Sequence, residues 1–383
     1  MGRVLILGGG FGGVAAAHHL RALLGPDDEV VLADRGTHFM MGFRKNTELA
    51  GRATMAAGRR PLAALERQGI RVIQGTVTRI DPALRAAEID GGRLQADALV
   101  VALGAALDPE AVPGLADHAL NAYDPDQVPR AARAVAARRD GLLMIGIFGA
   151  PYMCPPAPYE LALLLEHTAR ARGTGPTLTV FTPQPMSLPV LGAAGCDVLE
   201  GELDRRGIGF RPNAKATAVE PGRVILADGE QLPFDLLLAV PPHRCPTLLV
   251  EAGLAEPGAW VRPDPGTLQT PFEGVWAIGD CTQIPLASGQ PMPKAGVLAE
   301  AEGRVVAERI AARLAGREPT AVFDGQGACF LEVGGGEARM VRGRFLATPA
   351  PEVELTEASH RFLEEKARYE RERLDTWFTR ADR

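Results

Sequence analysis

Cys154 has the most unusual surroundings of any potentially reactive side chain in this sequence. Residues 154–160 read CPPAPYE, and four prolines stand between positions 151 and 158. A thiol on a stiff loop just before a helix N-terminus is favoured as the thiolate, which is its nucleophilic form. A free cysteine is more often a small buried apolar residue, but a proline frame is unusual for packing alone. The pattern therefore predicts a reactive cysteine at position 154.

A glycine-rich turn near the start of the chain suggests a second kind of chemistry. Residues 4–7 read VLIL, as in a parallel strand buried on both faces, and GGGFGG follows before an alanine-rich helical stretch. In this motif Gly8 permits the tight turn, Gly10 lets the backbone approach a pyrophosphate, and Gly13 allows close packing of helix on strand. With Gly12 in the same loop, the phosphates would lie over the helix N-terminus. The turn predicts a dinucleotide site.

Two further features complete the dinucleotide pattern. The apolar run 29–33 ends at Asp34, at the separation from the glycines where such a unit places the acid that binds ribose hydroxyls. Two later apolar runs, 99–105 and 270–280, end in glycine or Gly-Asp, and the second precedes PKAG at 293–296 and a helix that we expect to end near residue 314. The cofactor-binding residues expected in these later segments are Ala102, Gly104, Gly279, Asp280 and Lys294.

A central strand lacks the features needed for a second dinucleotide. The buried run 142–149 is followed by the proline loop rather than by GxGxxG, and proline has no amide N–H to offer a phosphate. The next run, 177–181, ends without an acid for a nicotinamide ribose. We therefore expect the pyridine nucleotide site to be lost. The short runs 71–74, 85–89 and 92–94 suggest a small antiparallel excursion.

Several of these motifs carry a family resemblance. CPPAPYE, PPH at 241–243, PKAG, and GACF at 327–330 resemble the sulfide:quinone oxidoreductases and the flavoprotein subunit of flavocytochrome c sulfide dehydrogenase, which have two dinucleotide-binding-type domains. The resemblance implies an α/β fold of two Rossmann-like domains with a discontinuous FAD-binding domain and a C-terminal segment. The expected boundaries are 1–106 and 256–316 for the FAD domain, 107–255 for the second Rossmann-like domain, and 317–383 for the C-terminal region.

The same resemblance implies that Cys154 and Cys329 form a redox pair beside FAD. Hydrosulfide would attack their disulfide, giving a persulfide on one cysteine and a thiolate on the other, and two electrons would pass to FAD. Family precedent makes Cys329 the flavin-facing thiol, although the sequence alone does not order the two. Glu160 could accept protons or simply be a favourable first-turn acid. Lys294 could stabilise charge on reduced flavin or be an exposed surface lysine.

The expected function is FAD-dependent oxidation of sulfide, or of a related small sulfur species, with a quinone as electron acceptor. Some members of the resembled family attach FAD covalently through a cysteine in the segment that corresponds roughly to residues 38–46. Because these residues contain no cysteine here, the resemblance implies non-covalent FAD. The alternatives are a cytochrome-linked sulfide dehydrogenase, an enzyme like the type II NADH:quinone dehydrogenases, and a flavin-binding protein without turnover. The proline loop argues against NADH, and the lack of an export signal favours quinone over cytochrome.

Composition excludes several other classes. The chain has 383 residues, 46% hydrophobic and 23% charged, as in a soluble globular protein. A formal net charge of −6 gives no reason to expect nucleic acid as a partner. The five cysteines are widely spaced, so no metal site is expected.

The chain termini bear on location. No apolar run approaches the length of about 18 residues of a membrane span, and the N-terminus runs directly into the glycine motif, so we expect a cytoplasmic protein. Residues 359–383 have a helical pattern with an apolar stripe. This stripe could dip into a membrane interface, giving peripheral attachment to the inner face, or pack on the FAD domain or on a second subunit of a homo-oligomer. Packing is favoured slightly.

Overall fold

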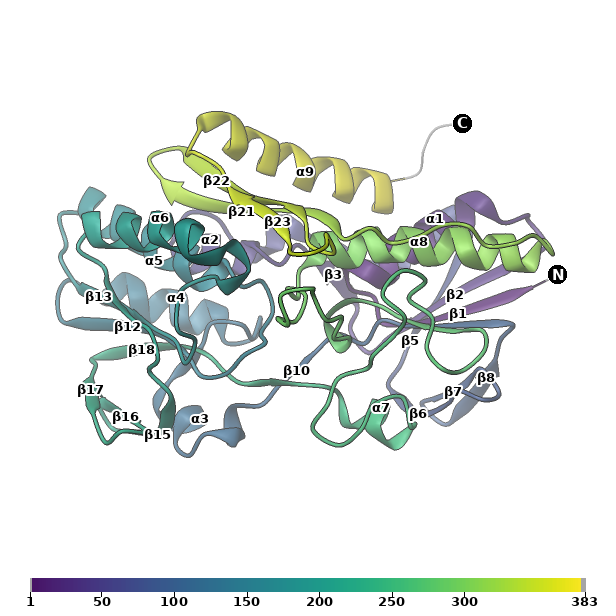
Figure 1. The fold of residues 1–383 in the computed structure, drawn as a ribbon, viewed down its shortest axis with the longest axis horizontal. Helices are drawn as coiled ribbons and strands as arrows, with labels where there is room; N and C mark the ends of the chain where they lie inside the picture. Colours follow the sequence, from purple (N-terminus) through teal and green to yellow (C-terminus); the bar gives the residue numbers. More distant parts are fainter. Residues whose placement is uncertain (1, 380–383) are drawn as a thin grey trace.

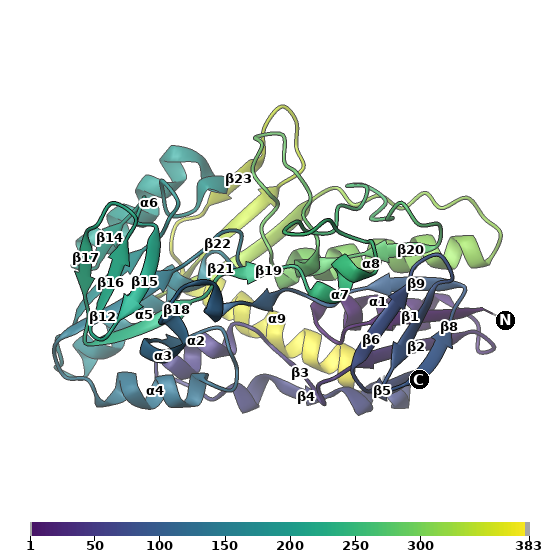
Figure 2. The same ribbon diagram turned by 90° about the horizontal axis from the view of Figure 1, so that it is seen from below.

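The computed structural model describes residues 2–379 and places two five-stranded parallel sheets side by side (Figures 1 and 2). Their strand orders are β20-β9-β1-β2-β5 and β11-β18-β12-β13-β14. These two sheets, with helices packed on them, confirm the predicted α/β class with two Rossmann-like units. The first sheet contains β1 (Arg3–Leu7), β2 (Glu29–Asp34), β5 (Ile70–Gln74), β9 (Ala98–Val101) and β20 (Val275–Ala277).

The first sheet forms as the apolar runs predict. Side chains 4–7 of β1 are fully buried. Val4 and Ile6 pack in one core with α1 (Phe11–Leu23) and α8 (Gly296–Leu314), which lie beside each other on one face of the sheet, and Leu5 and Leu7 pack in a second core on the other face. The two helices approach closely at Gly303, where a Cβ would lie 2.5 Å from the carbonyl oxygen of Gly12. This close contact fixes the glycine turn against α8. Because β1, β9 and β20 pair in parallel, their carboxyl ends lie at the same edge of the sheet.

One strand prediction is wrong. The run 71–74 was expected in the antiparallel excursion, but it forms β5, which pairs in parallel with β2 at the edge of the first sheet. As an edge strand β5 is only partly covered, and its sequence mixes polar with apolar residues, unlike the continuous apolar runs of the central parallel strands. The antiparallel sheet itself consists of β6 (Val77–Asp81), β7 (Ala86–Ile89) and β8 (Gly92–Gln95).

The second parallel sheet carries the proline loop. Its strands are β11 (Leu120–Asn121), β12 (Leu142–Ile147), β13 (Thr177–Phe181), β14 (Gly209–Arg211) and β18 (Leu236–Val240). The loop 148–156 joins the central strand β12 to α5, so it leaves the sheet at the carboxyl end. The helices of this half are α3 (Leu115–His118), α4 (Val128–Ala137), α5 (Ala157–Ala171) and α6 (Gly192–Arg205). Its small antiparallel sheet contains β15 (Ala216–Glu220), β16 (Arg223–Leu226) and β17 (Gln231–Pro233).

Short segments connect the halves. The chain passes between them through β10 (Ala106–Leu107) and β19 (His243–Arg244), which pair with each other. A second small pair, β3 (His38–Met40) and β4 (Arg59–Pro61), flanks the helix α2 (Arg44–Leu49) in sequence. The short helix α7 (Thr247–Glu251) follows β19.

The C-terminal region lies across both halves (Figure 1). It contains the antiparallel strands β21 (Gln326–Gly334), β22 (Glu337–Arg344) and β23 (Glu352–Leu355), followed by α9 (His360–Phe378). Trp377 of α9 makes edge contacts with Phe11 and Phe39 of the first half, with ring centroids 6.0 and 5.5 Å apart. Leu374 and Phe378 are also buried. The prediction that the apolar stripe packs on the protein is therefore confirmed for these residues; positions 380–383 lie outside the described residues.

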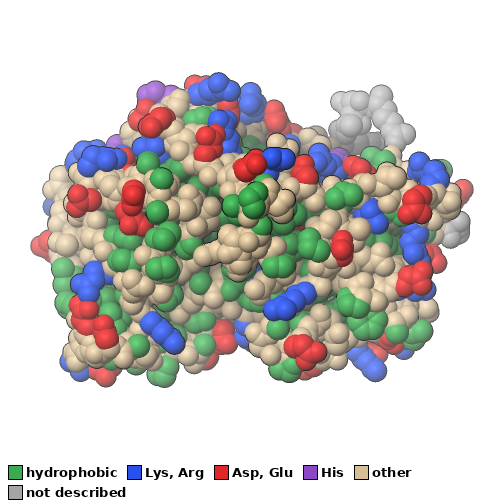
Figure 3. Space-filling view, in the orientation of Figure 1, with side chains coloured by type: hydrophobic (Ala, Val, Ile, Leu, Met, Phe, Trp, Pro, Cys, Tyr) green, Lys and Arg blue, Asp and Glu red, His purple; other side chains and the backbone are tan. Residues whose placement is uncertain are grey.

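Among residues 2–379, none of the helices is long and apolar enough to cross a bilayer. Within the same residues no cluster of histidine, cysteine and acidic side chains has metal-ligand geometry. On the face shown in Figure 3, acidic and basic side chains are interspersed rather than gathered by sign.

Candidate functional site

A cavity of about 300 Å³ lies where the two halves and the C-terminal region meet. It brings together residues that are up to 359 positions apart, from Gly10 to Tyr369. Three predicted site residues, Gly8, Gly13 and Asp34, do not line it and instead shape the turn beside it. The predicted site residues that do line it are Gly10, Gly12, Ala102, Gly104, Cys154, Glu160, Gly279, Asp280, Lys294 and Cys329.

The glycine turn is shaped for a close-lying ligand. Gly8 has a φ of +112°, and a Cβ there would lie 2.2 Å from the carbonyl oxygen of Ala102. A Cβ at Gly13 would lie 1.8 Å from the carbonyl oxygen of Gly8. At Gly10, in contrast, a Cβ would meet nothing within 4 Å. The first two glycines are required by the turn itself, whereas the third leaves open space at the start of α1, where a pyrophosphate fits.

The contrast between Gly10 and Gly13 gives a test. Gly10→Leu should fold, because its side chain enters open space, but it should weaken FAD binding by at least about tenfold by filling the phosphate position. Flavin absorbance relative to protein absorbance in the purified variant measures this loss. Gly13→Ala should fail to fold, because its methyl group overlaps backbone. A Gly10→Leu protein with full flavin content would contradict the assignment of the pyrophosphate position.

Asp34 stabilises the glycine turn through hydrogen bonds to its carboxylate. One carboxylate oxygen accepts the N–H of Gly9 at 2.6 Å and the other accepts the N–H of Gly36 at 2.6 Å. The carboxylate therefore lies at the end of β2, beside the turn, where the sequence predicted the ribose-binding acid. Each oxygen keeps a free lone pair that a ribose hydroxyl could use.

Asp280 presents a buried acceptor without a donor. Its Oδ1 atom is inaccessible and has no hydrogen-bond partner. Burial raises the pKa of Asp280, and the positive charge of Lys294 offsets part of that rise. An unsatisfied buried carboxylate oxygen is costly, and a hydroxyl donor such as those of a ribityl chain would satisfy it. The residues present therefore fit FAD.

Lys294 is not the exposed surface lysine that was one reading of the sequence. It is only 4% exposed, and its Nζ donates to the carbonyl oxygens of Asp280 and Thr282, each at 2.8 Å. The ammonium also lies 3.4 Å from the centre of the Trp260 ring. Burial lowers the pKa of Lys294 to about 8. Lys294 therefore lines the cavity beside Asp280, and the two carbonyl groups stabilise its positive charge.

The two cysteines predicted to pair share the cavity. Cys154 lies on the proline loop with a φ of +50°, and its N–H donates to the carbonyl oxygen of Lys294 at 2.6 Å. Cys329 lies on β21, opposite Val341 of β22. Both are thiols in the structure and both are half-buried. The charge on each sulfur affects the other, since ionised Cys154 raises the pKa of Cys329.

The expectation that the loop favours a Cys154 thiolate is wrong for this structure. Burial raises the pKa of Cys154 to about 12, and the Glu160 carboxylate adds to the rise. The positive charges of Lys45 and Lys366 act in the opposite direction without overcoming burial. Burial likewise raises the pKa of Cys329. The dipole of the helix that follows Cys154 favours the thiolate. Burial of the loop under the rest of the protein has the larger and opposite effect on the pKa.

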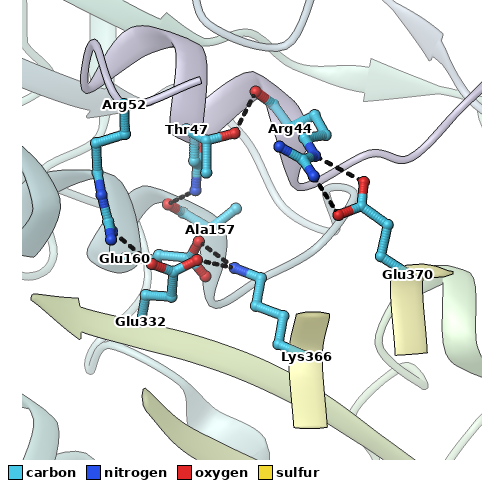
Figure 4. A network of polar contacts seen from close by, with 9 residues as sticks. Arg44, Thr47, Arg52, Ala157, Glu160, Glu332, Lys366 and Glu370 are labelled. Atoms are coloured by element: carbon cyan, nitrogen blue, oxygen red, sulfur yellow. Dashed lines mark hydrogen bonds and ion pairs between the residues drawn. The ribbon is translucent and has the colours of Figure 1, made fainter. Parts of the chain in front are cut away.

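Glu160 belongs to a buried network of charges (Figure 4). It lies in the first turn of α5, as predicted, and its Oε1 is 2.9 Å from Nζ of Lys366 on α9. The same Nζ lies 2.9 Å from Oε1 of Glu332 on β21, whose other oxygen pairs with Arg52 at 2.5 Å. Burial raises the pKa of Glu160, while Lys366 and Arg52 hold that of Glu332 below its usual value. Any proton accepted by Glu160 must therefore compete with Lys366.

Sequence reasoning missed several residues of the cavity. Lys45, Tyr123 and Lys366 all line it, as do Phe43 and Tyr369. One signal was available: the chain has only four lysines, and three of them line this cavity. The aromatic residues carried no such signal, because their positions follow only from packing.

A glycine turn with room for a pyrophosphate, an unsatisfied carboxylate and two thiols on one cavity define a dinucleotide-dependent redox protein. Its class is that of the FAD-dependent oxidoreductases. Residues 2–303 match the family model of the pyridine nucleotide-disulphide oxidoreductases, and the chain belongs to this family.

Individual relatives are similar over most of the chain. The mouse mitochondrial sulfide:quinone oxidoreductase is 22% identical over 361 residues, covering 90% of this chain and 79% of the relative. The type II NADH:quinone oxidoreductase of Staphylococcus aureus is 24% identical over 344 residues, covering 84% and 85%. The crystal structure of the Aquifex aeolicus sulfide:quinone oxidoreductase superposes with a TM-score of 0.87 at 22% identity, covering 98% of this chain and 92% of that one. The resemblance to the sulfide:quinone oxidoreductases and the FAD cofactor predicted from it are confirmed.

Proposed function

We propose that this protein oxidises sulfide, or a related small sulfur species, through Cys154 and Cys329 and passes the electrons to a quinone. The observation that carries the proposal is the meeting of two thiols, 175 positions apart in sequence, on the cavity that fits FAD. FAD, when bound, supplies a two-electron acceptor. The similarity to proteins named sulfide:quinone oxidoreductases supports the same activity.

The cysteines would act as a disulfide that a sulfur nucleophile opens. Hydrosulfide attacks one sulfur, the S–S bond breaks, and the chain then holds a persulfide on one cysteine and a thiolate on the other. When the persulfide releases its proton and two electrons leave for the acceptor, the persulfide and the thiolate form a new S–S bond, so that the added sulfur links the two cysteines. Because burial disfavours the thiolate at both positions, positive charge on the cavity wall must assist this step.

The walls near Cys329 support a quinone acceptor. Phe330 and Tyr369 face each other with ring centroids 6.2 Å apart, and both line the cavity together with Phe43 and Val297. An apolar, aromatic lining suits a neutral ring better than it suits a charged acceptor.

The similarity to type II NADH:quinone oxidoreductases makes NADH oxidation the second candidate. The loop 148–156 speaks against it. Pro151, Pro155 and Pro156 have no N–H, and the N–H of Cys154 is already bonded to Lys294. A pyrophosphate would find few donors at the start of α5, whereas glycine fingerprints offer several.

Anaerobic titration distinguishes the two candidates. Sulfide should bleach the flavin absorbance near 450 nm, a wavelength typical of oxidised flavins, or produce a long-wavelength charge-transfer band. Reduction by NADH should be at least about 100-fold slower, because the proline loop offers a pyrophosphate few N–H donors. Adding a soluble quinone should then restore the absorbance. Bleaching by NADH as fast as by sulfide would overturn the proposal in favour of NADH dehydrogenase activity.

A further inference from the structure

Lysine is used selectively in this chain. Only four of its 41 lysines and arginines are lysines. Among residues 2–379, Lys45, Lys294 and Lys366 line the cavity and no arginine does. An ammonium is a compact point charge that can approach a small anion closely, whereas a guanidinium spreads its charge over a planar fork. The distribution indicates that positive charge in the cavity serves a small partner.

Two of these three ammonium groups each have two hydrogen-bond acceptors in the protein. Lys366 lies 2.9 Å from each of two carboxylates, and Lys294 donates to two carbonyl oxygens. Lys45 differs. Its Nζ donates to one carbonyl oxygen, that of Tyr123 at 3.1 Å, and among residues 2–379 no carboxylate pairs with it. An ammonium has three donors, so Lys45 retains hydrogen-bonding capacity in a cavity that it lines.

Lys45 is tied to the reactive cysteine through one residue. The backbone of Tyr123 accepts from Lys45, and the hydroxyl of Tyr123 donates to the carbonyl oxygen of Cys154 at 3.3 Å. Burial lowers the pKa of Lys45, and ionised Cys154 is the largest of the charges that oppose this effect. The negative charge of ionised Cys154 therefore acts on the Lys45 ammonium more strongly than the charges of Asp280 and Asp124 do.

We propose that Lys45 is the anion-binding residue of the cavity, holding a small sulfur anion such as hydrosulfide or a persulfide beside Cys154. This inference rests on the proposed function and names the charge state of its substrate. An anion entering an apolar cavity requires a countercharge, and Glu160 and Asp280 on the same wall would repel it. Among residues 2–379, Lys45 is the cavity lysine with a single hydrogen-bond acceptor and no carboxylate partner, and its ammonium also lies 5.2 Å from the centre of the Tyr123 ring.

The test compares an anionic and a neutral thiol reagent on the FAD-loaded, pre-reduced enzyme. The rate constants for alkylation of Cys154 by iodoacetate and by iodoacetamide are measured by peptide mass spectrometry, and their ratio is taken. Because the ratio cancels changes in thiol ionisation, it reports attraction of the anion alone. Lys45→Gln, which keeps a donor for the Tyr123 carbonyl, should lower the ratio by about tenfold. Lys45→Arg should keep most of it.

Lys215→Met is the matched control, since it removes one exposed positive charge elsewhere and should leave the ratio unchanged. With sulfide, Lys45→Gln should also raise the half-saturating concentration by about tenfold, with less change in the limiting rate of flavin reduction. An unchanged alkylation ratio, or loss of FAD from Lys45→Gln, would overturn the assignment. If sulfide fails to bleach the wild-type flavin while the ratio still falls in Lys45→Gln, the anion site stands and the proposed function is refuted.

Discussion

Replacing Cys329 by alanine is expected to abolish flavin reduction by sulfide, with a loss of at least about 10³-fold. With Cys329 removed, Cys154 has no partner sulfur on the cavity, so no disulfide can form for hydrosulfide to open. The alanine removes one sulfur from β21 and leaves the backbone pairing with β22 intact. The variant should therefore fold and retain FAD.

The measurement is an anaerobic stopped-flow record of flavin absorbance after mixing with sulfide. Cys196→Ala provides the matched control: Cys196 is 2% exposed within α6, does not line the cavity, and should retain its rate within a few-fold. Flavin content measured on both variants separates a loss of chemistry from a loss of cofactor. If Cys329→Ala bleaches as fast as the wild type, the cysteine pair has no part in the reaction.

The parts of the fold that the sequence predicts are those determined locally. The run 4–7 and the glycine motif specify strand, turn and helix within a single stretch, because Gly8 is required by its φ of +112° and Gly13 by its contact with the carbonyl oxygen of Gly8. The edge strand β5 was misassigned, since its mixture of polar and apolar residues reflects whether a neighbour covers its faces. That depends on the tertiary arrangement and not on the run itself.

The candidate site was less predictable because it is assembled from distant segments. Lys366 meets Glu160 across 206 positions, and neither residue carries a motif that requires the other. The predicted direction of the Cys154 pKa shift was wrong because burial of the loop also depends on distant segments. A proline loop before a helix favours the thiolate locally, but the C-terminal region closes over the cavity and burial dominates. Lys45 was not predicted, because residues 38–46 were considered only for the absence of a cysteine that could bind FAD.

The buried charge network predicts the largest effect on stability. Replacing Lys366 by methionine should lower the free energy of unfolding by about 3–5 kcal/mol at pH 7, the usual cost of removing one partner from a buried ion pair. Glu332 keeps Arg52, but Glu160, which is 3% exposed, loses the positive charge that it contacts. Because Lys366 joins α9 to α5 and β21, its loss also loosens the C-terminal region over the cavity.

The loss should depend on pH. In the wild type the pKa of Glu332 is lowered, so its contribution is present above the usual carboxyl pKa and is lost as the pH falls through the lowered value. The pKa of Lys366 is raised, so its contribution is present below the usual lysine pKa, across the whole neutral range. Without Lys366 the two carboxyls bind protons more readily. The deficit of Lys366→Met should therefore be largest near pH 7 and shrink as the pH falls toward 4.5.

Urea unfolding at pH 5 and pH 7 measures this deficit, with Arg361→Met as control. Arg361 lies on the same helix and pairs with Glu365 at 2.7 Å, but its side chain is 78% exposed, so its loss should cost less than about 1 kcal/mol at either pH. Adding Glu160→Gln to Lys366→Met removes the uncompensated charge and should recover about half of the lost stability. A deficit equal at both pH values, or no recovery in the double variant, would show that Lys366 stabilises α9 by packing rather than by charge.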